Sequence, residues 1–74
     1  MGLGITYLKL EQWDLAIADY SSALRLESKL ASSLYGRGVA QLRKGVTDRG
    51  GADIAAAKAI APNIVREFAR YGLN

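Results

Sequence analysis

The sequence predicts an all-α fold built from antiparallel helix hairpins, and two patterns indicate it. Gly4, Gly38 and Gly72 stand 34 residues apart, so one frame repeats along the chain. Residues of similar size and polarity recur in that frame, as the pairs Ile5 and Val39, Leu8 and Leu42, Tyr20 and Ile54, Ala23 and Ala57, and Leu26 and Ile60. A period of this length is typical of stacked helical units that bury their apolar faces against one another. No segment alternates apolar and polar residues with β-branched enrichment, so we predict no strand.

The first half of the chain predicts two helices. Apolar residues at a three-to-four spacing make one face of a helix from Gly2 to Leu10. Glu11-Gln12 is a short connection. The carboxylate of Asp14 favours the start of a second helix, which extends to Glu27 with a wide apolar face.

The middle of the chain predicts a third helix, from about Leu30 to Lys44. Ser28 is expected as its N-cap, because a serine hydroxyl can accept a bond from a free N–H of the first turn. Gly45 follows the helix directly, where a left-handed conformation costs glycine nothing.

A fourth helix is predicted to end near Ile60, with Thr47 or Asp48 as its cap. Gly50-Gly51 weakens its first turn by roughly 1 kcal/mol per glycine relative to alanine. A fifth, closing helix follows, because Pro62 suits a first helical turn and Gly72 suits a helix end. We therefore expect one domain over residues 1–74, with repeat 1 at about 1–30, repeat 2 at about 31–64 and the closing helix at about 62–72.

These residues resemble the tetratricopeptide repeat (TPR) family. The first repeat reproduces the family's L-G-x-x-Y and A-x-x-x-F/Y elements, at Leu3-Gly4, Tyr7, Ala16, Tyr20, Ala23 and Leu26. The second repeat keeps Gly38, Ala57 and Pro62. It departs from the family's Leu, Tyr, Ala and aromatic residue at Arg37, Gln41, Gly50 and Ile54, respectively. The resemblance implies an α-solenoid of about two repeats plus a closing helix.

The resemblance also implies a function, which is to hold a protein or peptide on the concave face made by the first helix of each repeat. The positions that it places on this face are Ile5, Leu8, Lys9, Tyr35, Val39, Leu42, Arg43, Arg66 and Arg70. An apolar floor with a basic rim suits an acidic or amphipathic peptide. Val39 and Leu42 have a second interpretation, which is burial between helices.

Composition argues against several other functions. The chain has no Cys and no His, which excludes disulfides, thiolate or imidazole metal sites and the usual catalytic bases and nucleophiles. We therefore expect no enzyme activity and no cofactor. The net charge of +3 comes from residues 43–74 and makes no dense basic stripe, so we expect no nucleic-acid partner. No apolar run approaches a membrane span and no signal peptide is predicted, so we expect no membrane partner, and the compartment stays open.

Self-association is the alternative function. Met1 is expected to lie inside the first helix, so Ile5, Leu8, Trp13 and Leu15 would lie at an edge with no preceding repeat. An exposed apolar edge of this kind is typical of an interface, and a symmetric homodimer is the commonest way to bury it. A longer parent chain that supplies the missing helix would bury it equally well.

Overall fold

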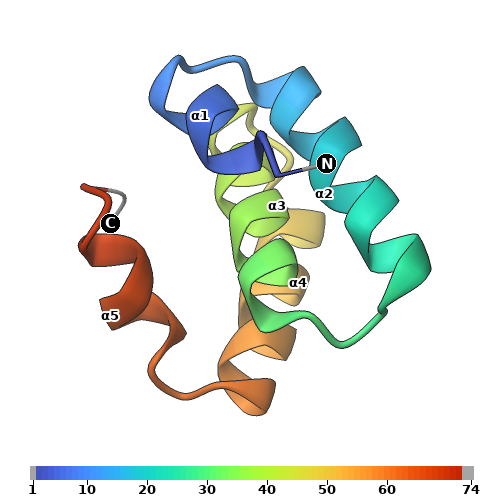
Figure 1. Ribbon diagram of the computed structural model, residues 1–74, viewed down its shortest axis with the longest axis vertical. Coiled ribbons are helices and arrows are strands. Elements are labelled where there is room, and N and C mark those ends of the chain that lie inside the picture. Colours follow the sequence, from blue (N-terminus) through green and yellow to red (C-terminus); the bar gives the residue numbers. More distant parts are fainter. Residues whose placement is uncertain (1, 73–74) are drawn as a thin grey trace.

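The computed structural model describes residues 2–72, and these residues form five α-helices and no strand (Figure 1). The helices are α1 (Gly4–Lys9), α2 (Trp13–Leu26), α3 (Ala31–Arg43), α4 (Thr47–Ile60) and α5 (Ile64–Ala69). Consecutive helices up to α4 pack against each other as antiparallel hairpins. The predicted all-α fold of helix hairpins with a closing helix is confirmed.

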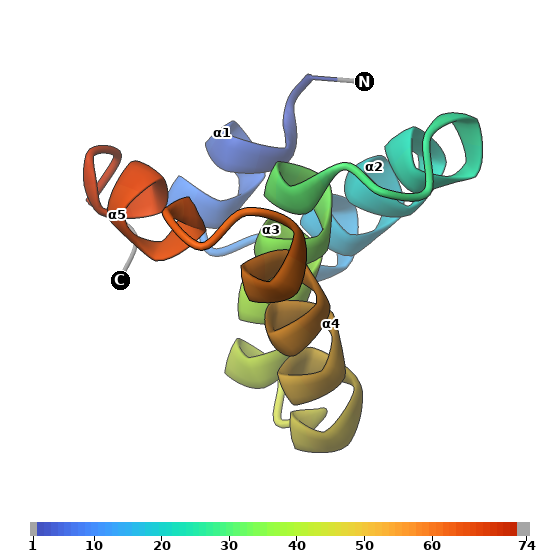
Figure 2. The same ribbon diagram turned by 90° about the horizontal axis from the view of Figure 1, so that it is seen from below.

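The helix α3 lies at the centre of the molecule and contacts all the other helices. Figures 1 and 2 show α2 and α5 on the two sides of α3. The helix α3 has more buried residues than any other helix. Every residue from Ser33 to Gln41 except Arg37 is buried. The core of the fold is therefore built around this helix.

Two predicted N-caps are wrong. Ser28 lies in a turn, and Leu30 occupies the cap position of α3 with no side chain bonded to the first turn. The connection is longer than predicted because the Leu30 amide first bonds back to the Glu27 carbonyl. The helix α4 begins at Thr47 with Val46 as its cap, so its first-turn amides also lack a side-chain partner.

The two terminal helices are shorter than predicted. Gly2 has a φ of +90°, so α1 begins only at Gly4. Ala61 is extended, as expected for a residue before proline, and α5 therefore begins after Pro62 rather than at it. The left-handed conformation predicted for Gly45 is present, and Gly72, predicted at a helix end, also has a positive φ.

Tyr20 of α2 inserts its ring between α1 and α3 at two glycines. A methyl group at either Gly4 or Gly36 would overlap this ring. Tyr20 is 7% exposed, and Ala16, one turn earlier, is fully buried. The helices can approach each other here because both positions lack a side chain.

The alanines of the repeat frame have different surroundings. Ala57 is completely buried in the core, which agrees with a position at a helix contact. Ala23 is half-buried and lines a hollow beside Gly4 and Ser32.

The backbones of α3 and α4 cross at Gly38 and Gly50. A Cβ atom on Gly38 would lie 2.8 Å from the Gly50 carbonyl oxygen, and a Cβ on Gly50 would lie 2.9 Å from the Gly38 oxygen. These oxygens belong to helix backbones, so they cannot move aside as the end of a flexible side chain can. The repeat glycine at Gly38 is therefore needed for the α3–α4 packing.

We predict that Gly38→Ala lowers the free energy of unfolding by about 1 to 3 kcal/mol, because the added methyl overpacks the crossing. Gly51→Ala is the matched control, since nothing lies within 4 Å of its Cβ position and alanine favours a helix by about 0.5 to 1 kcal/mol over glycine. Urea denaturation followed by circular dichroism measures both variants. Equal stability of the two variants would contradict the crossing.

Candidate binding surface

Three of the predicted groove residues line one hollow where α1 and α3 end. Leu8 and Lys9 belong to α1, and Arg43 is the last residue of α3. The hollow has a volume of about 300 Å³ and is lined by Leu8, Lys9, Glu11, Trp13, Arg43, Tyr71 and Gly72. We call it the aromatic hollow. It combines two cations, one carboxylate and two aromatic rings.

Sequence analysis did not place Trp13 and Tyr71 in the binding site. Trp13 is half-buried at the start of α2, and Tyr71 is exposed just after α5. The Lys9 ammonium lies 5.9 Å from the centre of the Tyr71 ring, within the range of a cation–π contact. Both aromatics adjoin helix ends rather than a helix face, so helical periodicity carries no signal for them.

Tyr35 and Val39, also predicted for the groove, lie in the core. The Tyr35 ring stacks on Phe68 of α5, with centroids 4.7 Å apart and planes tilted by 54°. Tyr35 is 5% exposed and Phe68 is 2% exposed. The structure thus gives both groove residues a packing role, which is the second interpretation left open for Val39, and partner binding by them stays a prediction.

The other predicted groove residues are dispersed. Ile5 is half-buried and lines a separate hollow of about 200 Å³ together with Tyr20 and Phe68. Leu42 is 40% exposed, and its side chain packs on Gly50 of α4. Arg66 and Arg70 are exposed on and just after α5. Direct binding by these four residues stays a prediction.

The edge predicted for self-association is only partly exposed. Leu15 is accessible, whereas Leu8 is 1% exposed and belongs to the core. Ile5 and Trp13 are half-buried. Met1 lies outside the described residues. A homodimer through this edge stays a prediction, and Leu8 is not available to it.

One ion pair and one tyrosine dominate the electrostatics near the core. Arg37 donates to Asp53 through Nε at 2.7 Å and through Nη2 at 3.1 Å, and this bonding raises the pKa of the Arg37 guanidinium. The Tyr20 hydroxyl is buried with no hydrogen-bond partner among residues 2–72. Burial, aided by the negative charge of Asp19, raises the pKa of Tyr20 well above its usual value.

Within the described residues, no group of three or more His, Cys, Asp or Glu side chains could hold a metal ion. None of the helices in residues 2–72 has the length and apolar character needed to cross a membrane.

A family model described as TPR repeat matches residues 4–45. The chain belongs to the TPR family. The match covers α1, α2, α3 and the turn that follows, which is the part whose repeat pattern is most complete. No curated protein and no solved structure matches the chain. TPR repeats are in general non-catalytic scaffolds for protein–protein interactions. In this TPR protein the aromatic hollow brings charged side chains and two aromatic rings together.

Tyr20 yields a prediction about pH. The unfolded chain loses the Tyr20 proton near pH 10, while the folded chain retains it, so stability from this group is complete below about pH 10 and falls above it. Between pH 10 and 11 this loss is about 1 kcal/mol. Tyr20→Phe removes this contribution, so its unfolding free energy should fall less over the same range. Urea denaturation at the two pH values measures the difference, and equal losses in the two proteins would contradict it.

Proposed function

We propose that this TPR chain binds an acidic, amphipathic peptide segment of a protein partner in the aromatic hollow. The observation that supports the proposal is the meeting of Lys9 and Arg43 with Trp13 and Tyr71 in one hollow. Tryptophan, tyrosine and arginine are the residues that most often carry binding energy at protein interfaces. The proposal involves no catalysis and no cofactor.

The chemistry of the hollow favours a particular pattern in the peptide. An apolar side chain of the partner would contact the faces of Trp13 and Tyr71. A neighbouring carboxylate would accept hydrogen bonds from the Arg43 guanidinium, which can offer two parallel donors. Lys9 adds a second positive charge. Glu11 on the rim repels a carboxylate placed on its side, so it sets the orientation of the peptide.

A chain of aromatic contacts positions the hollow. Phe68 packs on Tyr35 of α3, and Tyr71 meets Phe68 edge to face with centroids 6.4 Å apart. Tyr71 lies just after α5, and its contact with the buried ring of Phe68 positions it at the aromatic hollow. Tyr35, which the sequence predicted for the binding face, is buried. In this proposal it contributes indirectly, because it packs against Phe68 of α5. Arg66 on α5 and Arg70 just after it provide further positive charge for a longer acidic segment.

We predict that the double variant Lys9→Glu, Arg43→Glu binds at least about tenfold more weakly, because both favourable charges become repulsive. The probe is a fluorescein-labelled 15-residue helical peptide with leucines on one face and glutamates on the other, and fluorescence anisotropy measures its affinity.

The control is Lys29→Glu, Lys58→Glu, which makes the same change in net charge at two exposed positions that do not line the hollow. Circular dichroism confirms the helix content of both variants. Equal affinities of the two double variants would contradict the proposal, because charge alone would then account for binding.

A further inference from the structure

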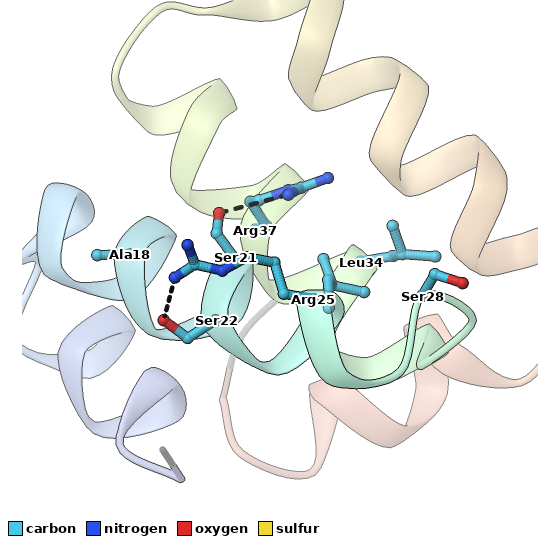
Figure 3. A pocket seen from close by; sticks show the side chains of 8 residues that line it. Ala18, Ser21, Ser22, Arg25, Ser28, Leu34 and Arg37 are labelled. Atoms are coloured by element: carbon cyan, nitrogen blue, oxygen red, sulfur yellow. Dashed lines mark hydrogen bonds between the residues drawn. The ribbon is translucent and has the colours of Figure 1, made fainter.

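A second surface lies between α2 and α4, over α3. It consists of two hollows, of about 550 and 400 Å³, that share Ser21 and Arg37. Figure 3 shows the larger of the two. We call the pair the α2–α4 groove; its linings are Ala18, Ser21, Ser22, Leu24, Arg25, Ser28, Leu34 and Arg37 in one hollow, and Ile17, Ser21, Arg37, Gln41, Arg49, Ala52 and Asp53 in the other.

The α2–α4 groove and the aromatic hollow lie on different sides of α3. The groove is lined by Leu34, Arg37 and Gln41, which recur every three to four residues along one face of the helix. Arg43, which lines the aromatic hollow, follows Gln41 by two residues and therefore lies about 160° away from it around the helix axis, at about 100° per residue. Tyr35, stacked on α5, lies about 100° from Leu34 by the same geometry. A ligand in the groove would therefore not occupy the surface of the proposed function.

The groove exists where the second repeat differs from the first. In the 34-residue frame Leu3 corresponds to Arg37 and Tyr7 corresponds to Gln41. Two polar side chains thus replace an aliphatic and an aromatic one at equivalent positions. Gln41 has a smaller side chain than tyrosine, and both Arg37 and Gln41 line the hollow of about 400 Å³.

These polar groups are not all satisfied by the chain itself. Arg37 is held by Asp53 and donates to the Ser21 hydroxyl at 3.3 Å (Figure 3). Gln41 is different: it is 8% exposed, and its Oε1 atom is buried with no hydrogen-bond partner in the described part of the chain. A buried acceptor without a partner costs free energy, and a ligand that supplies a donor removes that cost.

The charges on the groove point to an acidic ligand. Among residues 2–72, Asp53 is the only carboxylate that lines the groove, and it is already paired with Arg37. Arg25 donates to a neutral partner, the Ser22 hydroxyl, at 3.1 Å (Figure 3). Arg49 is exposed, and the ion pairs among residues 2–72 join other groups, Arg37 with Asp53 and Lys44 with Asp14. Arg25 and Arg49 are therefore positive charges that the groove itself does not neutralise.

We propose that the α2–α4 groove is a second binding site, which takes an extended acidic peptide segment of a protein partner. The side-chain amide of Gln41 carries an acceptor and a donor, and a peptide backbone offers the complementary pair. Backbone groups inside a helix are already bonded to each other, so the segment that bonds Gln41 is extended. Its acidic side chains pair with Arg25 and Arg49.

The test uses a fluorescein-labelled decapeptide of alternating glutamate and threonine, and fluorescence anisotropy with the 74-residue chain. Arg25→Glu, Arg49→Glu should weaken binding about tenfold, since both pairs become repulsive. Gln41→Leu, which keeps every charge and removes the unpartnered polar group, should weaken it about threefold or more. Lys29→Glu, Lys58→Glu is the charge-matched control and should bind like the unmodified chain.

Three results would overturn the proposal. Normal binding by both groove variants would show that the groove is not used. Weakening only in Lys9→Glu, Arg43→Glu would place the peptide in the aromatic hollow, which leaves the proposed function intact and removes the second site. Equal binding of a ten-nucleotide single-stranded RNA, lost in the same variants, would show a general polyanion surface rather than a peptide site.

Discussion

The close approach of neighbouring helices to α3 is the constraint on which the rest of the structure depends. Tyr20 occupies the space that side chains at Gly4 and Gly36 would fill. At Gly38 and Gly50 the backbones of α3 and α4 meet with no side chain between them. Interiors of proteins are packed as densely as organic crystals, so contacts this close allow one arrangement of the helices rather than several. The positions of α1, α2 and α4 all follow from it.

Both surfaces considered for binding arise from this arrangement. The aromatic hollow forms where α1, the start of α2 and the end of α3 converge. Tyr71 also lines it, and its ring contacts Phe68, which in turn packs on Tyr35 of α3. The α2–α4 groove forms on another side of α3, where the polar residues Arg37 and Gln41 stand at the positions of Leu3 and Tyr7 in the first repeat. A single central helix thus supports two surfaces that carry excess positive charge but differ in character: one is aromatic and the other is polar. Under the two proposals, this difference lets one small repeat protein distinguish two kinds of acidic partner segment.

The fold could be predicted because the repeat frame is local. Glycines at Gly4 and Gly38 and the apolar spacing around them specify helices and their crossings within short stretches of sequence. The helix starts were harder, because Ser28 has the right chemistry for a cap and its place in the turn is decided by a backbone bond to Glu27. The closing helix begins later than predicted because Ala61, the residue before Pro62, is extended. Apolar periodicity gives no information about this boundary.

The site was predicted less well, for physical reasons. The burial of Tyr35 depends on where α5 packs, and that packing is tertiary rather than local. Trp13 and Tyr71 adjoin helix ends, so no helix face predicts them. Their cationic neighbours Lys9 and Arg43 were predicted for the groove and line the same hollow, and partner binding by them stays a prediction. Comparison of the two repeats shows that Gln41 stands where the first repeat and the TPR pattern have a tyrosine. Only the structure shows that its side-chain oxygen is buried without a hydrogen-bond partner among residues 2–72.

Native-state hydrogen exchange tests the central role of α3 most directly. Amides in the cooperative core of a small protein exchange only when the whole molecule unfolds, while peripheral elements open at lower free energy. If the close contacts of α3 hold the fold together, its amides from Gly36 to Ala40 should exchange with the free energy of global unfolding, and those of α5 should exchange well below it. Exchange of these α3 amides at a lower free energy than the amides at the centre of α2 would contradict the account.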